Sequence, residues 1–480
     1  MTTYETIIGL EVHTELLTES KIFCSCSTRF GQQPNTQCCP VCLGLPGALP
    51  VLNRQVAQLA LRLCLSTGCD ITPVTRFDRI NYFYPDLPKA YQISQLHEPI
   101  GRNGRLRLTA YPDRVVRIHE IHMEEDAGKL THDPWSDQTL VDYNRCGVPL
   151  LEIVSEPDLR SADEALDYLA TLRKLLMFLG VSDGRMEQGS LRADVNVSVR
   201  KTGTDVLGTR TEMKNMNSFK AIGRAIAHEA QRQIDLLNEG GTILQETRRW
   251  DENKEMSVAM RSKENAQDYR YFPDPDLPSV KLDSEWIERV RENLPERPEQ
   301  KVSRYQQEWQ LSAYEAEQLT DEPFLADLLE KTIICGAKPA DVSSWILGEW
   351  LQACRSGNCD ASDLNVQPEA LAKLLEMVRQ KLITRTTARD VFTQMIDRQV
   401  DPQTYVREHG LAMVNDLDDL KQMVASVLAE SERSVKDYLA GKEKAKTYLI
   451  GQVMRKSRGK ANPAHVNKLV EQQLEQYRQL

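Results

Sequence analysis

Two stretches of the chain alternate apolar and polar residues with a period of two, which restricts both to strands of a sheet. Across residues 190–200, apolar side chains occupy every second position from Leu191 to Val199. The alternate positions, from 190 to 200, carry Ser190, Arg192, Asp194, Asn196, Ser198 and Arg200. Because successive strand residues point to opposite faces, this pattern predicts one apolar face and one charged or hydrogen-bonding face.

The N-terminal segment repeats this arrangement. Ile8, Leu10 and Val12 fall on one side of a strand, and the other side carries Glu11, His13 and Glu15. A third polar run consists of Arg210, Glu212 and Lys214. Segments 106–108 and 115–121 flank a turn and predict a hairpin. We therefore expect a sheet whose polar face forms a binding cradle.

Helices are predicted between these strands. Ser161 and Glu164 have the spacing of a capping box that opens a helix ending at Gly180, and a second helix runs from about Ser218 to Gly240. The predicted fold class is α+β, an antiparallel-sheet cradle domain with flanking helices. An all-α helical domain and an all-α tail domain follow.

The second part of the 480-residue chain is patterned for helices almost throughout. A linker-like segment, 291–298, contains two prolines and precedes this region. We expect three domains, with boundaries at 1–292, 293–405 and 406–480.

Charge and hydropathy limit the classes of function. The chain has 60 Lys and Arg against 70 Asp and Glu, and a net charge of −10 argues against a basic coat that wraps nucleic acid. No signal-peptide pattern or long apolar run is present, so we expect a cytoplasmic protein without a membrane partner.

One local basic cluster stands out near the C-terminus. Its members are Lys442, Lys444, Lys446, Arg455, Lys456, Arg458 and Lys460. Such a run is either a solvated helix face or a surface that contacts RNA phosphates, and the sequence alone leaves both interpretations open.

Five of the eleven cysteines lie between residues 24 and 42. Cys24-x-Cys26 and Cys39-x-x-Cys42 supply two close pairs of thiolates, which suits a tetrahedral Zn²⁺ site. Four sulfur ligands leave no open coordination position, so this zinc would be structural. Cys38 is an alternative to Cys39, whose spacing to Cys42 favours it; reduced loop thiols are the other interpretation.

Hard ligands gather elsewhere. Glu11 and His13, with the acidic run 124–126, suit Mg²⁺ or Mn²⁺ that holds phosphate, and Glu187 and Asp194 could join the same site. An ordinary polar strand face neutralised by arginines is the alternative. The chain contains no P-loop, no G-x-G-x-x-G turn and no G-x-S-x-G elbow.

Eight stretches, in order, resemble one known family along the whole chain. They are IGLEVH (8–13), CPVCLG (39–44), NYFYPDLPK (81–89), HMEEDAGK (122–129), VPLLEIVSEPD (148–158), GSLR (189–192), KNMNSF (214–219) and DYRYFP (268–273). The sequence is similar to the B subunits of the aspartyl-tRNA(Asn)/glutamyl-tRNA(Gln) amidotransferases.

The resemblance implies a carbon–nitrogen ligase in a heterotrimer. ATP would phosphorylate the side-chain carboxylate of glutamate or aspartate misattached to tRNA, and ammonia would displace the phosphate. The amidase (glutaminase) of such a complex, its A subunit, would release that ammonia from glutamine, and the small C subunit would brace the pair.

The resemblance also implies residue roles. It assigns Mg²⁺ to Glu11, His13 and Glu124, with Glu187 and Asp194 nearby, and offers Lys89, Arg192 and Lys214 as cations for phosphate oxygens. Two rival functions remain at this stage: a non-catalytic zinc-containing tRNA-binding scaffold, and a self-sufficient metallohydrolase that uses Glu11, His13 and Glu124.

Overall fold

The two alternating runs form adjacent central strands, β1 (Tyr4–Glu15) and β11 (Leu191–Lys201). They pair antiparallel from Tyr4 opposite Lys201 to Thr14 opposite Leu191. The computed structural model describes residues 3–133, 135–262, 269–413, 417–457, 461 and 463–479. Both predicted strands are confirmed.

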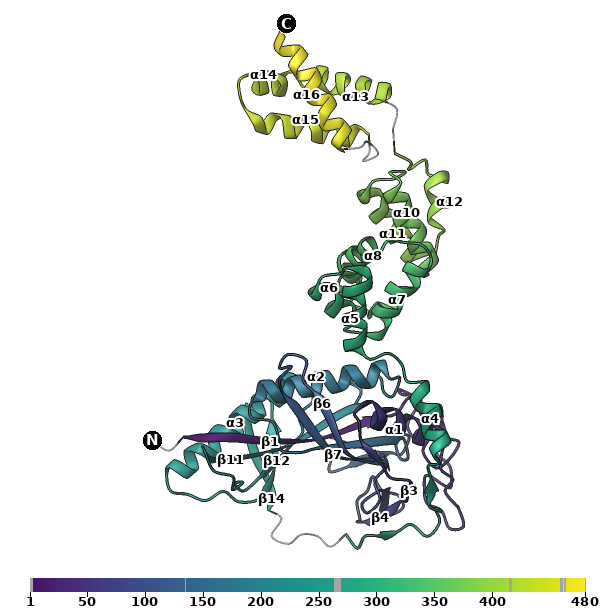
Figure 1. Cartoon of the computed structure of the whole chain (residues 1–480), viewed down its shortest axis with the longest axis vertical. Helices are drawn as coiled ribbons and strands as arrows, with labels where there is room; N and C mark the ends of the chain where they lie inside the picture. Colours follow the sequence, from purple (N-terminus) through teal and green to yellow (C-terminus); the bar gives the residue numbers. More distant parts are fainter. Residues whose placement is uncertain are drawn as a thin grey trace. The chain divides into compact units, whose positions relative to one another are not determined.

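A nine-stranded sheet organises the first part of the chain (Figure 1). In spatial order its strands are β14 (Met256–Ser262), β13 (Glu246–Asp251), β12 (Thr211–Lys214), β11, β1, β10 (Pro149–Ser155), β7 (Val115–Glu125), β6 (Gly101–Arg107) and β2 (Asp70–Ile71). The pairs are antiparallel except β12 with β13, which is parallel. The predicted hairpin is confirmed as β6 and β7.

Among the described residues, short strands form three smaller sheets. They are β15 (Phe272–Pro273), β4 (Asp78–Asn81) and β5 (Tyr91–Ser94); β16 (Val280–Lys281) and β3 (Val74–Thr75); and β8 (Lys129–His132) and β9 (Thr139–Asp142).

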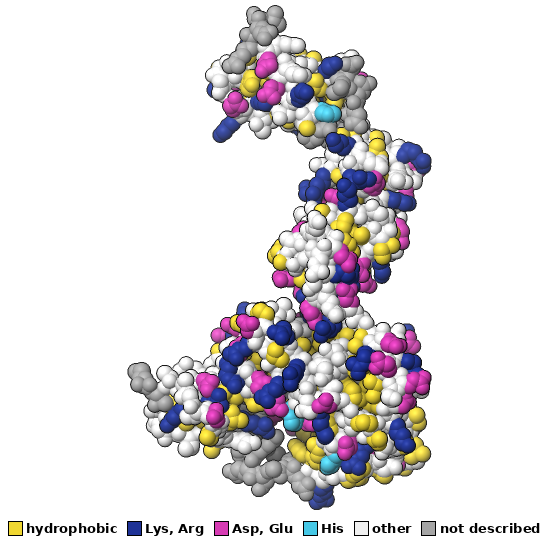
Figure 2. Space-filling view, in the orientation of Figure 1, with side chains coloured by type: hydrophobic (Ala, Val, Ile, Leu, Met, Phe, Trp, Pro, Cys, Tyr) yellow, Lys and Arg dark blue, Asp and Glu magenta, His cyan; other side chains and the backbone are white. Residues whose placement is uncertain are grey.

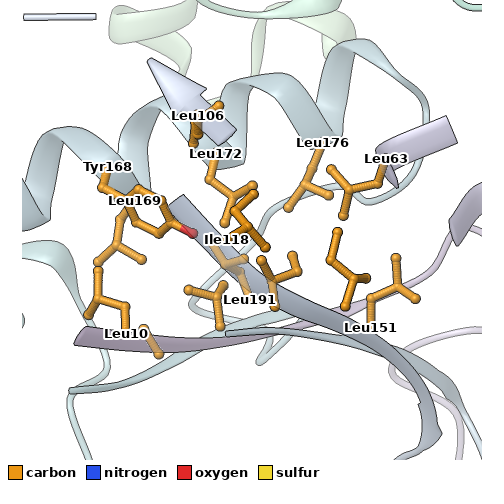
Figure 3. Packing of buried hydrophobic residues seen from close by; sticks show 14 of the residues in the cluster. Leu10, Leu63, Leu106, Ile118, Leu151, Tyr168, Leu169, Leu172, Leu176 and Leu191 are labelled. Atoms are coloured by element: carbon orange, nitrogen blue, oxygen red, sulfur yellow. The ribbon is translucent and has the colours of Figure 1, made fainter. Parts of the chain in front are cut away.

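Helices α1 (Arg54–Ser66) and α3 (Phe219–Asn238) contact strands of the large sheet, α2 (Ala162–Phe178) packs beside α3, and α4 (Ser284–Glu292) packs on α1. Figure 3 shows Leu169, Leu172 and Leu176 of α2 lying over Leu10 and Leu191 of the sheet. The apolar positions of both alternating runs belong to this core. The helices therefore cover the predicted apolar face of the sheet, and the polar residues lie on the opposite face.

Both predicted helix starts are confirmed, one with a correction. The hydroxyls of Ser161 and Ser218 accept backbone N–H bonds from Glu164 and Ala221. The Glu164 carboxylate, however, accepts from the backbone N–H of Arg160 at 2.8 Å. The predicted capping box would have used the N–H of Ser161, so its reciprocal half is displaced by one residue.

The remaining elements are helices. They are α5 (Pro298–Trp309), α6 (Ala313–Leu319), α7 (Pro323–Ile334), α8 (Pro339–Trp345), the π-helix η1 (Ile346–Trp350), α9 (Leu351–Gly357), the 3-10 turn η2 (Ala361–Asp363), α10 (Pro368–Arg379), α11 (Arg385–Arg398), α12 (Pro402–Glu408), α13 (Leu417–Glu430), α14 (Glu432–Leu439), α15 (Glu443–Lys456) and α16 (Pro463–Gln479). The predicted α+β class, with a helical C-terminal region, is confirmed.

The chain divides into two compact units, residues 1–298 and 299–480. Within the second unit, buried residues between Leu420 and Leu474 form a separate apolar core. The predicted division into three domains stays a prediction. On the face drawn in Figure 2, acidic and basic side chains are interspersed on each unit. Among the described residues, no helix combines the length and apolar character needed to cross a bilayer.

Candidate active site

Strand register brings a first carboxylate cluster together on the polar face. Glu11 of β1 lies opposite Asp194 of β11, and Glu212 of β12 lies opposite Asn196, the next residue on that face of β11. One oxygen from each of Glu11, Asp194 and Glu212 lies within 4.8 Å of the others. The Asn196 side-chain amide donates to Glu11 at 2.9 Å and helps to orient it.

A second cluster lies on the other side of β1. His13 faces Glu152 of β10 in register, and its Nε2 lies 3.5 Å from Oε1 of Glu124 and 3.9 Å from Oε1 of Glu152. These three ligand atoms also lie within 4.8 Å of one another. Glu11 and His13 point to the same face because they are two residues apart on one strand.

Crowding of negative charge marks both clusters. Burial raises the pKa of Glu124 well above its usual value, and the charges of Glu152 and Asp126 raise it further. Burial also raises the pKa of Glu11, and Glu152 is the next cause. A divalent cation would relieve this repulsion, and carboxylate oxygens are the ligands that Mg²⁺ prefers. The donor sets therefore fit such an ion.

Two cations adjoin the clusters. Lys214 Nζ lies 2.6 Å from Asp194 and 3.1 Å from Glu212, while Arg192 Nη2 lies 3.0 Å from Asp126. Burial lowers the pKa of Lys214, but Asp194 and Glu212 outweigh it and raise the pKa above its ordinary value. Lys214 is therefore charged at neutral pH.

Glu187 does not join either cluster. It lies in the segment before β11 and lines a cleft of about 680 Å³ together with Glu15, Arg145 and Arg192. Burial and then the charge of Asp126 raise the pKa of Glu15 to about 8. The volume lies within the range of small-ligand and cofactor sites.

Lys89 pairs with Glu125, which belongs to neither cluster. Lys89 Nζ lies 2.6 Å from Oε2 of Glu125. Burial lowers the pKa of Lys89, but Glu125 outweighs it and raises the pKa. The structure therefore gives Lys89 a carboxylate partner that the sequence analysis did not anticipate.

The predicted thiol cluster is assembled. One sulfur atom from each of Cys24, Cys26, Cys39 and Cys42 lies within 4.8 Å of the other three. Cys38 lies outside this group and contacts Asn144 at 3.9 Å, which favours Cys39 as the fourth ligand.

Interactions among these thiols shift their pKa values in opposite directions. A hydrogen bond from Cys24 lowers the pKa of Cys42 to about 4, whereas burial raises the pKa of Cys26 to about 11. Four close sulfur atoms suit Zn²⁺.

The C-terminal basic cluster is partly neutralised. Lys442, Lys446 and Lys456 pair with Asp437, Glu471 and Glu430, respectively. Within the described part of the chain, Lys444 and Arg455 have no acidic partner. Arg458 and Lys460 lie outside the described residues.

Sequence reasoning missed two members of the clusters, Glu152 and Glu212, as metal ligands. Glu152 interrupts a run of apolar residues, Pro149–Val154, and a lone acid in such a run was the available signal. Glu212 was recognised as part of a polar run only. The strand partner that places each carboxylate could not be read from local sequence.

Comparison with known proteins decides the family. A family model described as the GatB/GatE catalytic domain matches residues 6–288, and one described as the GatB domain matches residues 327–474. The chain belongs to the GatB family. The first matched region holds both carboxylate clusters and the thiol cluster.

Curated GatB relatives match nearly end to end. The B subunit of the aspartyl/glutamyl-tRNA(Asn/Gln) amidotransferase from Lachnoclostridium phytofermentans is 52% identical over 475 residues, 99% of each chain. The protein of the same name from Agathobacter rectalis is 53% identical over 472 residues, 98% of this chain and 99% of the relative. That from Carboxydothermus hydrogenoformans is 47% identical over 481 residues, 99% of each. The predicted family and the predicted class, one component of an amidotransferase, are confirmed.

Proposed function

We propose that this chain performs the ATP-dependent step that converts misattached glutamate or aspartate on tRNA to its amide. The pair of carboxylate clusters on either side of β1, flanked by Lys214 and Arg192, is the observation that carries the proposal. The names of its GatB relatives, which join aspartyl- and glutamyl-tRNA to amidotransferase activity, support the same substrates.

The chemistry needs two displacements. An oxygen of the amino acid's side-chain carboxylate attacks the γ-phosphorus of ATP, and the bond from that phosphorus to the bridging oxygen breaks to release ADP. Ammonia then attacks the acyl carbon, loses a proton and expels inorganic phosphate. Phosphoryl transfer depends mainly on positioning and on neutralising phosphate charge.

We propose that His13, Glu124 and Glu152 hold one Mg²⁺ and that Glu11, Asp194 and Glu212 hold another. When bound, Mg²⁺ would supply positive charge to the phosphate oxygens. Glu187 would act from the adjacent cleft, where Arg145 and Arg192, which both contact Asp126, would bind an anionic group such as the phosphates of ATP. Lys214 would orient the carboxylates of the first cluster and meet phosphate at its edge.

The remaining sites would support this reaction. Cys24, Cys26, Cys39 and Cys42 would hold a structural Zn²⁺, and the C-terminal basic cluster, which includes cations of α15, would contact tRNA phosphates. A separate amidase would hydrolyse glutamine to ammonia, and a small third protein would complete the complex.

Reconstitution tests the proposal. The chain is co-expressed with its amidase and small partner proteins, and tRNA charged with labelled glutamate or aspartate is supplied with glutamine, ATP and Mg²⁺. We expect amidated product only when this chain and ATP are both present. Glutaminase activity without amidation of either tRNA would contradict the proposal and favour a tRNA-binding scaffold. Hydrolytic activity by this chain alone would favour a metallohydrolase.

A further inference from the structure

Lys21 places a fully buried ammonium group beside the thiol cluster. Its side chain is 0% exposed, and it lies three residues before Cys24. Nζ lies 2.8 Å from the carbonyl oxygen of Gln37, 3.4 Å from that of Tyr143 and 3.7 Å from Sγ of Cys42. The lysine therefore donates to both the cysteine loop and the segment before β10.

Among the described residues, no carboxylate forms an ion pair with Lys21. Glu125 and Asp276 line the same cavity of about 170 Å³. Glu125 pairs with Lys89, however, and Asp276 pairs with Arg79 at 2.8 Å. A buried charge is costly unless it is paired, so Lys21 needs another anion.

A metal held by four thiolates provides that anion. Four deprotonated sulfurs carry four negative charges and Zn²⁺ carries two positive ones, which leaves a net charge of −2 at a partly buried centre. Hydrogen bonds to ligand atoms tune such centres from outside the coordination sphere. We propose that Lys21 is the counter-cation of the metal–thiolate centre and that it slows metal release. This inference rests on the proposed structural metal.

Backbone hydrogen bonds next to Lys21 connect the cysteine loop to the sheet. The backbone N–H of Ile22 bonds to the carbonyl of Gly147 at 3.0 Å, and the N–H of Gly147 bonds to the carbonyl of Asp126 at 2.8 Å. Asp126 in turn pairs with Arg192 on the polar face. The Lys21 ammonium donates to the carbonyl of Tyr143, so it adds a second contact between the cysteine loop and the segment that contains Gly147.

The test compares Lys21→Met with Lys301→Met in the full complex. Methionine keeps an unbranched side chain of similar length but removes the charge. Lys301 supplies the control because its side chain is 12% exposed and pairs with Glu330, in the other unit. Zinc content is measured in each purified protein, and release is followed by adding a chelator in excess.

We expect Lys21→Met to release zinc at least about tenfold faster than the wild type, in the range of effects seen for groups that support metal ligands, with Lys301→Met unchanged. Equal release rates for Lys21→Met and the wild type would overturn the inference. The comparison requires that the wild type binds metal. A wild type that binds neither zinc nor Co²⁺ would refute the metal site itself.

Thermal unfolding separates charge compensation from packing. Each protein is measured with metal bound and after metal removal. We expect Lys21→Met to reduce the increase in melting temperature that metal provides. A loss of equal size in both forms would show that Lys21 acts only by packing and would overturn the proposal. Absorption of the Co²⁺ form should still report four thiolate ligands in Lys21→Met, at a higher metal concentration.

Discussion

Glu124 and Glu125 are consecutive residues of β7, and their carboxylates lie on opposite faces of the sheet. Glu124 lies 3.5 Å from His13 on the polar face, whereas Glu125 pairs with Lys89 and accepts the backbone N–H of Ile93 at 2.9 Å. The alternation of a strand separates the two acids. Only Glu124 of this pair can therefore serve the proposed metal site.

The neighbouring cysteines 38 and 39 provide a matched pair for the thiol cluster. We predict that Cys39→Ser loses most of its bound zinc, because Cys39 belongs to the four-sulfur group and Cys38 does not. Cys38→Ser should retain zinc at the wild-type level. Metal analysis of both purified variants checks this, and the reverse order would assign the ligand to Cys38.

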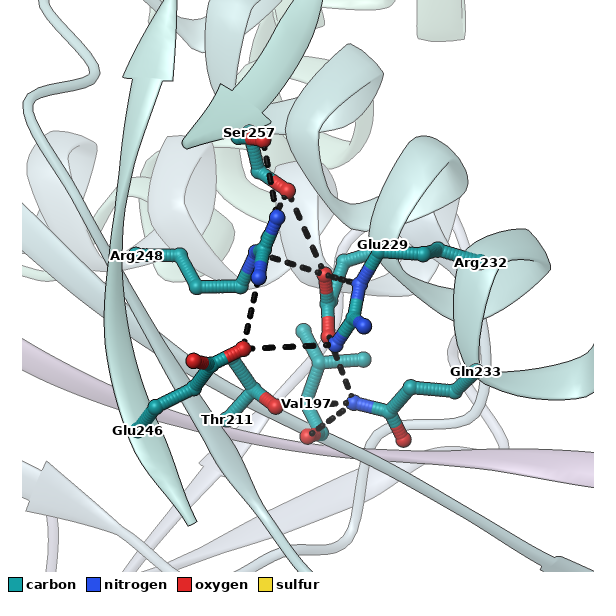
Figure 4. Close-up of polar contacts among 8 residues, drawn as sticks. All are labelled: Val197, Thr211, Glu229, Arg232, Gln233, Glu246, Arg248 and Ser257. Carbon is teal, nitrogen blue, oxygen red and sulfur yellow. Dashed lines mark hydrogen bonds and ion pairs between the residues drawn. The ribbon is translucent and has the colours of Figure 1, made fainter. Parts of the chain in front are cut away.

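A buried polar network anchors α3 to the strands at one end of the sheet (Figure 4). Glu229 is fully buried; its carboxylate lies 2.7 Å from Arg232 Nη2 and 3.7 Å from Arg248 Nε, and it accepts from Gln233 at 2.7 Å. Burial raises the pKa of Glu229, but hydrogen bonds from Arg232 and Gln233 outweigh it and lower the pKa below its usual 4.5. Its charged form is therefore favoured by folding.

We predict that Glu229→Gln lowers the free energy of unfolding at pH 7 by about 3 kcal/mol, because it removes the fully buried carboxylate that contacts both Arg232 and Arg248 and leaves Glu246 as their shared anion. A carboxylate with a lowered pKa stabilises the fold above its unfolded pKa and loses this contribution as pH falls through the folded value. The difference in the free energy of unfolding between variant and wild type should thus become smaller below about pH 4.5. Denaturant unfolding across pH measures it, and a gap independent of pH would contradict the assignment. Glu252→Gln, at an exposed pair with Arg224, is the control.

The packing of α2 on the sheet predicts a large stability effect for Leu172→Ala. The Leu172 side chain is 0% exposed and lies in the core beneath the helix. Truncation removes buried apolar surface and leaves a cavity, at a cost of about 2–5 kcal/mol. Leu140→Ala, at a side chain that is 65% exposed, should have little effect. Thermal unfolding of both variants checks the difference, and equal melting temperatures would contradict the described core.

Lys444 and Arg455 of α15, which have no acidic partner in the described part of the chain, test the RNA-binding interpretation of the basic cluster. We predict that changing Lys444 and Arg455 together to Ala raises KM for charged tRNA and leaves glutaminase activity unchanged. Each lost phosphate contact should also reduce the salt dependence of binding by about one counterion. Lys436→Ala, on α14, is the control. An unchanged KM and salt slope would favour a solvated helix face.

Local sequence predicted the strands, the helix starts and the polar face, because each depends on side-chain period or on caps within a few residues. It could not pair strands that are distant in sequence. Glu152 lies beside β1 because β10 pairs with β1. Glu212 lies near β1 because β12 pairs with β11, the neighbour of β1, while Glu187 lines a neighbouring cleft. Lys89 likewise has a partner, Glu125, that is set by tertiary packing.

The most direct measurement concerns Glu152, which enters the site through register alone. Amidation of Glu-tRNA(Gln) by the assembled complex is measured for Glu152→Gln and Glu156→Gln with ammonium chloride as the nitrogen donor, and glutaminase activity is measured alongside. Glu156 pairs with His119 outside both clusters and serves as the control. We predict that Glu152→Gln lowers the rate of ATP-dependent amidation by at least about 100-fold, as for loss of transition-state charge stabilisation, while glutaminase activity persists. Amidation at the rate of Glu156→Gln would contradict it.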